Sequence, residues 1–135
     1  MEFVRLFTRA QKLMRGITDE ELSRHGVRVG QNLVLEVLWT DDGLTPGELA
    51  TRLGVATPTV VKSVGRMEAA GLLTRGRDER DGRLVRIYLT EHGRAVRAPI
   101  EEARRRLEER VAGPLTEEER VVLRRVLTRI IDDLS

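Results

Sequence analysis

The chain has 135 residues, the size of one ordinary domain, and 40% of them are hydrophobic, enough for a packed core. It contains no cysteine, which excludes disulfides, thiolate catalysis and cysteine-based zinc sites. Its 24 basic residues, all arginine except Lys12 and Lys62, nearly balance 22 acidic ones. No apolar run is long enough to span a membrane and no signal peptide is seen, so we expect a cytoplasmic protein.

The first third of the chain predicts two helices. Apolar residues recur at steps of three and four over residues 2–24, which is the spacing of one helical face, and Gly26 then offers a stop signal. The same spacing predicts a second helix over residues 30–39, which ends before Asp41.

The middle of the chain carries two helix-start signals in close succession. Thr45-Pro46-Gly47-Glu48 is a capping box with proline at the first helical position, and it predicts a short helix that ends at Leu53. Thr57-Pro58-Thr59 is expected to cap a second helix that runs to Ala70, with one apolar stripe formed by Val60, Val61, Val64 and Met67. Two short helices so joined are the layout of a helix-turn-helix.

A β-hairpin is predicted next, because the apolar period changes to two after Gly71. Leu73 opens the first strand, and Val85, Ile87 and Leu89 share one side of the second. The six residues 78–83 between them are charged except for a glycine, and Asp81-Gly82 is a turn signal.

Two more helices are predicted at the C-terminal end. Thr90 is expected to cap a long helix through about Ala112, in which Pro99 predicts a kink or a break near Ala95. Thr116 and Glu119 form another capping box that opens the last helix. The predicted fold is therefore mainly α with a small β-hairpin wing: a winged helix-turn-helix flanked by N- and C-terminal helices.

The cations of the winged helix indicate DNA as its partner. The second helix of such a motif lies in the major groove, and an arginine at the wing tip is attracted to the minor groove of A·T-rich DNA. Asp78 and Asp81 are expected to support the wing by pairing with its arginines. We predict DNA contacts from the recognition helix at Thr57, Pro58, Thr59, Lys62, Ser63 and Arg66, and from the wing at Arg75, Arg77, Arg80 and Arg83.

At these residues the chain resembles the MarR family of winged-helix regulators. The family's wing pattern, Asp-x-Arg-Asp-x-Arg, stands here as Asp78-Glu79-Arg80-Asp81-Gly82-Arg83, and the segment from Ile87 to Gly93 matches the family's strand-to-helix junction. The stretch from Leu49 to Val60 matches its helix-turn-helix, and the resemblance covers essentially the whole chain. It implies one domain over residues 1–135, with DNA-binding residues 30–90 and helical dimerisation parts 1–28 and 91–135.

The resemblance also implies a homodimer that binds a pseudo-palindrome, most often as a repressor. The apolar residues at both ends of the chain support association independently, because they are more than a small winged helix can cover. The expected dimer interface comprises Phe3, Leu6, Phe7, Leu107, Val111, Leu123, Leu127, Ile130, Ile131 and Leu134.

Members of the family are commonly released from DNA by a small phenolic or aromatic acid, bound between the dimerisation helices and the winged helix. Met14, His25 and Trp39 are the candidates for such a pocket here, although a tryptophan at the end of a helical stripe is more often part of the core. We expect no other cofactor and no metal site, since two histidines without cysteine are too few ligands.

Two other classes of function remain open. A winged helix can serve protein–protein contact, or act as an architectural DNA-binding module without an effector. An exposed apolar face on the recognition helix would mark the protein-contact case, whereas Thr59, Lys62 and Arg66 favour DNA. An enzyme is not expected, because the sequence has no catalytic triad spacing, phosphate loop or metal-ligand cluster.

Overall fold

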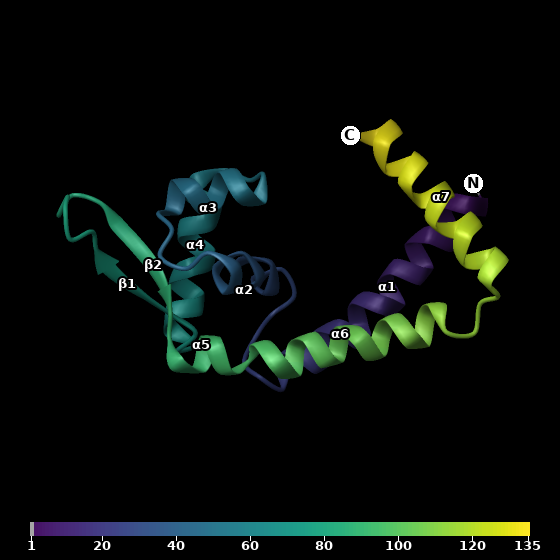
Figure 1. Ribbon diagram of the computed structural model, residues 1–135, viewed down its shortest axis with the longest axis horizontal. Coiled ribbons are helices and arrows are strands. Elements are labelled where there is room, and N and C mark those ends of the chain that lie inside the picture. The colour runs from purple at the N-terminus through teal and green to yellow at the C-terminus, as the bar shows by residue number, and fades with distance from the viewer. Residues whose placement is uncertain (1) are drawn as a thin grey trace.

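The structure is a computed structural model that describes residues 2–135, so Met1, where the predicted dimerisation part begins, lies outside the described residues. Figure 1 shows a winged-helix lobe, formed by α2 to α5 with the hairpin, and an arm formed by α1, α6 and α7. The elements are α1 (Glu2–Ser23), α2 (Gln31–Thr40), α3 (Pro46–Leu53), α4 (Thr57–Ala69), β1 (Leu73–Arg77), β2 (Val85–Leu89), α5 (Glu91–Ala95), α6 (Arg97–Ala112) and α7 (Glu117–Leu134). The predicted fold class is confirmed.

Two of the helix starts follow the capping boxes in the sequence. The Thr45 hydroxyl accepts the amide N–H of Glu48 at 3.2 Å, and the Glu48 carboxylate accepts the Thr45 amide at 3.2 Å, so α3 begins at Pro46. Thr116 and Glu119 make the same pair of bonds at the start of α7, at 3.1 and 2.9 Å. Each box satisfies amides that the first helical turn leaves unbonded.

The start of α4 differs from the prediction, because Ala56 rather than Thr57 is its N-cap. The Ala56 carbonyl accepts the amides of Thr59 and Val60 at 3.1 and 3.3 Å. Those are the two amides that a Thr57 cap would have bound, so the helix starts one residue earlier and Thr57 is its first residue. The Thr57 side chain is exposed and is left free of a capping bond.

The hairpin is antiparallel, with Leu73 opposite Leu89. Leu44 adds an isolated bridge beside β2, since its carbonyl accepts the amide of Ile87 at 2.8 Å. The base of the wing (residues 73–89) is thereby fixed to the segment that leads into α3. The tip turns after Asp81, whose carbonyl accepts a backbone N–H three residues later, as predicted.

The predicted long helix is broken at Val96 into α5 and α6. Pro99 carries no N–H and its ring crowds the carbonyl four residues earlier, that of Ala95, so a continuous helix is not possible there. After the break α6 leaves the lobe and packs beside α1, as Figure 1 shows.

Most of the core lies inside the lobe, and Leu22 of α1 and Ile100 of α6 join it from the arm. Its most deeply buried side chains come from the loop before α2, from α2, α3 and α4, from the residue before β1 and from β2: Val27, Leu35, Leu38, Leu49, Val60, Val64, Met67, Leu72 and Ile87. Trp39 packs at the edge of this core, and its indole N–H donates to the Gly93 carbonyl at 2.9 Å.

The arm, in contrast, leaves its apolar side chains uncovered. Leu22 is the one buried residue of α1, and none of the residues Glu117–Leu134 is buried. Exposed on these two helices are Phe3, Val4, Leu6, Phe7, Leu13, Met14, Val121, Val122, Leu123, Val126, Leu127, Ile131 and Leu134. So large an apolar surface is typical of a subunit interface.

Within residues 2–135 no helix combines the length and the apolar character needed to cross a membrane.

Candidate nucleic-acid interface

The recognition helix α4 buries one side in the core through Val60, Val64 and Met67. The prediction that Val61 belongs to the same stripe is wrong, because its side chain is 42% exposed. Val61 lies one residue further round the helix than Val60 and so points away from the lobe. It shares an outer face with Pro58, Lys62 and Gly65, which are all exposed; we call these four residues the outer face of α4.

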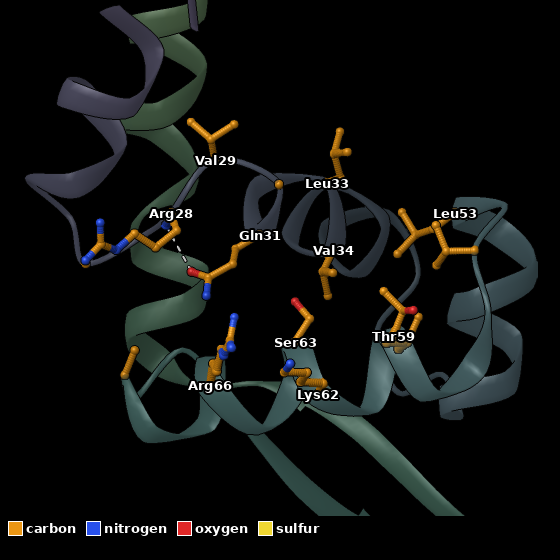
Figure 2. A pocket seen from close by; sticks show the side chains of 15 residues that line it. Arg28, Val29, Gln31, Leu33, Val34, Leu53, Thr59, Lys62, Ser63 and Arg66 are labelled. Carbon is orange, nitrogen blue, oxygen red and sulfur yellow. Dashed lines mark hydrogen bonds between the residues drawn. The ribbon is translucent and has the colours of Figure 1, made fainter. Parts of the chain in front are cut away.

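A groove runs along another side of α4, between this helix and the segment from Gly26 through the first turns of α2, and encloses about 830 Å³ (Figure 2). Thr59, Ser63 and Arg66 point into it, toward α2, and Lys62 also lines it. Ser63 is half-buried, and its hydroxyl lies 3.9 Å from the Met67 sulfur. Among the residues of α4 that were predicted to contact DNA, Ser63 therefore lies furthest from the outer face of the helix.

The wing tip is organised by Asp81. One of its carboxylate oxygens accepts the backbone N–H of Arg83 at 3.1 Å and the Arg83 Nε at 3.3 Å. The rest of the Arg83 side chain is 93% exposed. Asp81 therefore directs Arg83 without enclosing it, and the guanidinium remains available to a partner.

Asp78 differs from the expectation, since its side chain pairs with Arg86 and not with the guanidinium of Arg80. The distance from Asp78 Oδ2 to Arg86 Nε is 2.6 Å, while Oδ1 accepts the backbone amides of Arg80 and Asp81 at 2.7 and 3.0 Å. Arg86 also donates to the Gly43 carbonyl at 2.9 Å. This one arginine therefore connects the wing tip to the segment that leads into α3.

The Arg86 guanidinium, and after it the two backbone amides, hold the pKa of Asp78 below its ordinary value. A carboxyl group whose pKa is lowered by folding stabilises the folded state above its unfolded pKa, and this contribution is lost as the pH falls through the folded one. The support of the wing is therefore complete at neutral pH and weakens only in acid.

The remaining wing arginines have different surroundings. Arg75 pairs with Glu68 of α4, which ties the first strand to the recognition helix. Arg77 and Arg80 are exposed and have no carboxylate partner in the part of the chain that the structure describes. These two resemble Arg83 in offering charge to solvent, whereas Arg75 is already engaged within the protein.

Sequence reasoning missed the role of Arg86. It occupies an ordinary strand position. Asp78 lies across the hairpin from it, and its other partners, Gly43 and Glu48, are distant in the sequence; its Nη1 lies 3.6 Å from a Glu48 oxygen. No local pattern signals such a contact. The nearest hint was the alternation of acidic and basic residues in the wing.

The three residues predicted to line an effector pocket are not brought together, and none of them lines the groove beside α4, the cavity where α1, α2 and α6 meet, or the hollow at the start of α7. Trp39 is bound to Gly93, with the guanidinium of Arg97 5.9 Å from its ring centre. Met14 lies on the exposed surface of α1, and the carbonyl of His25 faces a ring nitrogen of His92 at 3.2 Å.

A different cavity lies where α1, α2 and α6 meet, with a volume of about 190 Å³. Its wall is mostly aliphatic, and Arg104 supplies a positive charge that also pairs with Glu36 of α2. The lining residues are Ile17, Thr18, Glu21, Leu22, Asn32, Ile100, Ala103, Arg104 and Leu107. The sequence could not indicate this cavity because its residues come from three separate helices.

The predicted interface residues all lie on the arm. Leu107 and Ile130 are half-buried in the protomer, and the others are exposed. For metals, residues 2–135 contain no group of three or more side chains of the types that could hold an ion.

Comparisons with known proteins agree with this geometry. A sequence profile of the MarR family matches residues 25–84. The HTH-type transcriptional regulator MgrA of Staphylococcus aureus is 28% identical over 126 residues, which cover 93% of this chain and 84% of MgrA. TtmR of Methylorubrum extorquens, another HTH-type transcriptional regulator, is 38% identical over 80 residues, which cover 59% of this chain but 41% of TtmR. The crystal structure of the S. aureus MepR–DNA complex superposes with a TM-score of 0.83 at 26% identity, covering 97% of both chains.

Proposed function

Because the chain belongs to the MarR family of winged-helix transcriptional regulators, we propose that it binds a pseudo-palindromic operator in double-stranded DNA as a homodimer and acts as a repressor. We infer a cytoplasmic location, because the protein must reach its DNA operator there. The observation that carries the proposal is the wing tip, where Asp81 directs an almost fully exposed Arg83 outward.

The charges around this surface support DNA as the partner. Lys62, Arg66, Arg77 and Arg80 are exposed, and none has a carboxylate partner among the described residues. Arginine and lysine in this state neutralise phosphates and release counterions, which is the main source of affinity for DNA. The wing would bring Arg83 to the minor groove while α4 occupies the adjacent major groove.

The uncovered helices of the arm support the homodimer. A two-fold axis through α1, α6 and α7 would cover the exposed apolar residues and present two recognition helices about 34 Å apart, one turn of DNA. In this arrangement residues 30–90 form the DNA-binding part of a single domain, and residues 1–28 and 91–135 form its dimerisation part.

The proposal includes a small phenolic or aromatic acid as an effector that releases the operator. The cavity at the junction of α1, α2 and α6 suits it, since aliphatic walls would cover a ring and Arg104 would bind its carboxylate. Arg104 also pairs with Glu36 of α2. An acid that displaces Glu36 from Arg104 would therefore loosen the contact between arm and lobe. Titration of 4-hydroxybenzoate against the bound operator, with Arg104→Ala as the insensitive variant, tests this part.

The central test is selection of bound duplexes from a random pool, followed by titration of the selected DNA at two salt concentrations. We expect an inverted repeat with half-sites about one turn apart, bound at least about 1,000-fold more tightly than random DNA. Affinity should fall steeply with salt because several phosphates per half-site are neutralised. A flat salt response would contradict DNA binding, and weak binding to every duplex would indicate the architectural alternative.

Arg83→Ala supplies the matched variant. It should bind the selected operator more weakly and prefer A·T-rich flanks less, while its oligomeric state stays unchanged, because the side chain touches only the wing tip. Equal affinities of the two proteins would remove Arg83 from the interface.

A further inference from the structure

The side chains of α4 divide among three surroundings, and Val61 is the apolar one that faces outward. Val60, Val64 and Met67 fill the core, and Thr59, Ser63 and Arg66 point into the groove beside α2. The outer face remains, with Pro58, Val61, Gly65 and Lys62, which also lines the groove. It is the side of the recognition helix that the proposed function places against base edges.

Nothing within the protein requires an apolar residue at position 61. The side chain is 42% exposed, and it is absent from the core and from the residues packed against it. One turn later, a Cβ built on Gly65 would meet no atom within 4 Å in residues 2–135 apart from the adjacent backbone of its own helix, so the surface beside Val61 is open. A partner can therefore approach this side chain closely.

The patch is too small to bind a protein. Val61 is flanked in sequence by Lys62 and across one helical turn by Gly65, whereas protein-binding patches gather several large apolar side chains. A single aliphatic side chain fits a single apolar group instead. In the major groove of DNA that group is the 5-methyl of thymine, since the other base edges there present hydrogen-bond donors and acceptors.

We propose that Val61 selects a thymine in each half-site by packing its two methyl groups against the thymine 5-methyl, an inference that rests on the proposed function. A valine can neither donate nor accept a hydrogen bond, so a G·C pair at this position would have polar groups covered without a partner. The β-branched side chain is held in few rotamers on a helix and loses little freedom on contact. Lys62 beside it supplies charge, and Val61 supplies the preference for A·T.

The experiment removes the 5-methyl group of a thymine from the DNA and the two methyl groups of Val61 from the protein. In the selected operator each thymine is replaced singly by deoxyuridine, which pairs identically but lacks the 5-methyl. For the wild-type protein we expect one position per half-site at which affinity falls about fourfold, the effect of one buried methyl group, and roughly the square of that when both half-sites are changed. For Val61→Ala the same replacements should change affinity less than twofold.

Thr128→Ala is the matched control, because it shortens a β-branched side chain of the same shape at an exposed position of α7, outside the predicted dimer interface and far from α4 in Figure 1. It should keep the wild-type response to deoxyuridine. Alanine favours the helix at position 61, so circular dichroism should show both variants folded.

Three results would overturn the inference: a selected operator without thymine in its half-sites, a wild-type protein indifferent to every deoxyuridine, or a Val61→Ala protein with an undiminished response. In each of them the wild type still binds its operator, so the proposed function survives. Failure of the wild type to bind any sequence specifically would overturn both.

Discussion

Leu127→Asp combined with Ile131→Asp is expected to convert the protein into monomers that no longer hold the operator. The two side chains are 38% and 63% exposed on α7, one helical turn apart on its apolar side. Burying each in a dimer would contribute about 1.5–3 kcal/mol, whereas an aspartate in the same place adds a desolvated charge that costs on the order of several kcal/mol. Light scattering measures the mass directly.

Loss of the dimer should reduce operator affinity about 100-fold or more, because two linked half-site contacts become independent ones. The variant should remain folded, since no residue of Glu117–Leu134 is buried and most of the core lies within the lobe. Circular dichroism checks this. A monomer that binds the inverted repeat as tightly as the wild type would separate dimerisation from DNA binding.

Arg125→Ser combined with Arg129→Ser is the control for the change in charge, because it also makes α7 more negative by two. These two residues are exposed, stand four positions apart like Leu127 and Ile131, and lie on the side of α7 opposite Leu127. The control should stay dimeric and bind the operator. Persistent dimers of the Leu127→Asp/Ile131→Asp protein would place the interface elsewhere on the arm.

The elements of the fold could be predicted because their signals are local. The Thr45 and Thr116 capping boxes involve residues three apart, and the period of two after Gly71 needs no distant partner. The start of α4 was misplaced by one residue, because a threonine before Pro58 is a local cap signal that the structure does not use. The backbone carbonyl of Ala56 closes the first turn instead.

The candidate site was less accessible to prediction, because its arrangement depends on contacts between distant segments. Arg86 reaches Gly43, and the Trp39 indole reaches Gly93, across more than forty residues in each case. Trp39 was a candidate for the effector pocket through the family resemblance, and its contact with Gly93 at the edge of the core has no signal in the local sequence. Val61 was placed in one apolar stripe with Val60, Val64 and Met67, but it stands one residue further round the helix than Val60, and its side chain is exposed.

The largest loss of stability is expected for Gly93→Ala, at the junction where the wing, α5 and Trp39 meet. A Cβ on Gly93 would lie 2.2 Å from the carbonyl oxygen of Leu72 and 3.3 Å from a methyl of Leu89. The Leu72 oxygen is backbone and cannot rotate away.

The backbone cannot shift easily at this position, because both the N–H and the carbonyl of Gly93 are hydrogen-bonded. Its N–H donates to the Thr90 hydroxyl at 3.0 Å, and its carbonyl accepts the Trp39 indole at 2.9 Å. Moving Gly93 to make room for a methyl group would break one of these bonds or shift β2 against the core. We expect the free energy of unfolding to fall by about 3 kcal/mol, the upper range for overpacking.

Gly16→Ala is the matched control, since a Cβ there meets no atom within 4 Å in the described chain and the residue lies inside α1. This variant should gain about 0.5–1 kcal/mol from the better helix propensity of alanine. Both are measured by denaturant unfolding at one fixed protein concentration, because association contributes to the stability of a dimer. Equal midpoints for Gly93→Ala and the wild type would show that the Leu72 backbone yields. In that case the junction between wing and arm is flexible, and an effector bound at the arm would change the position of the wing less.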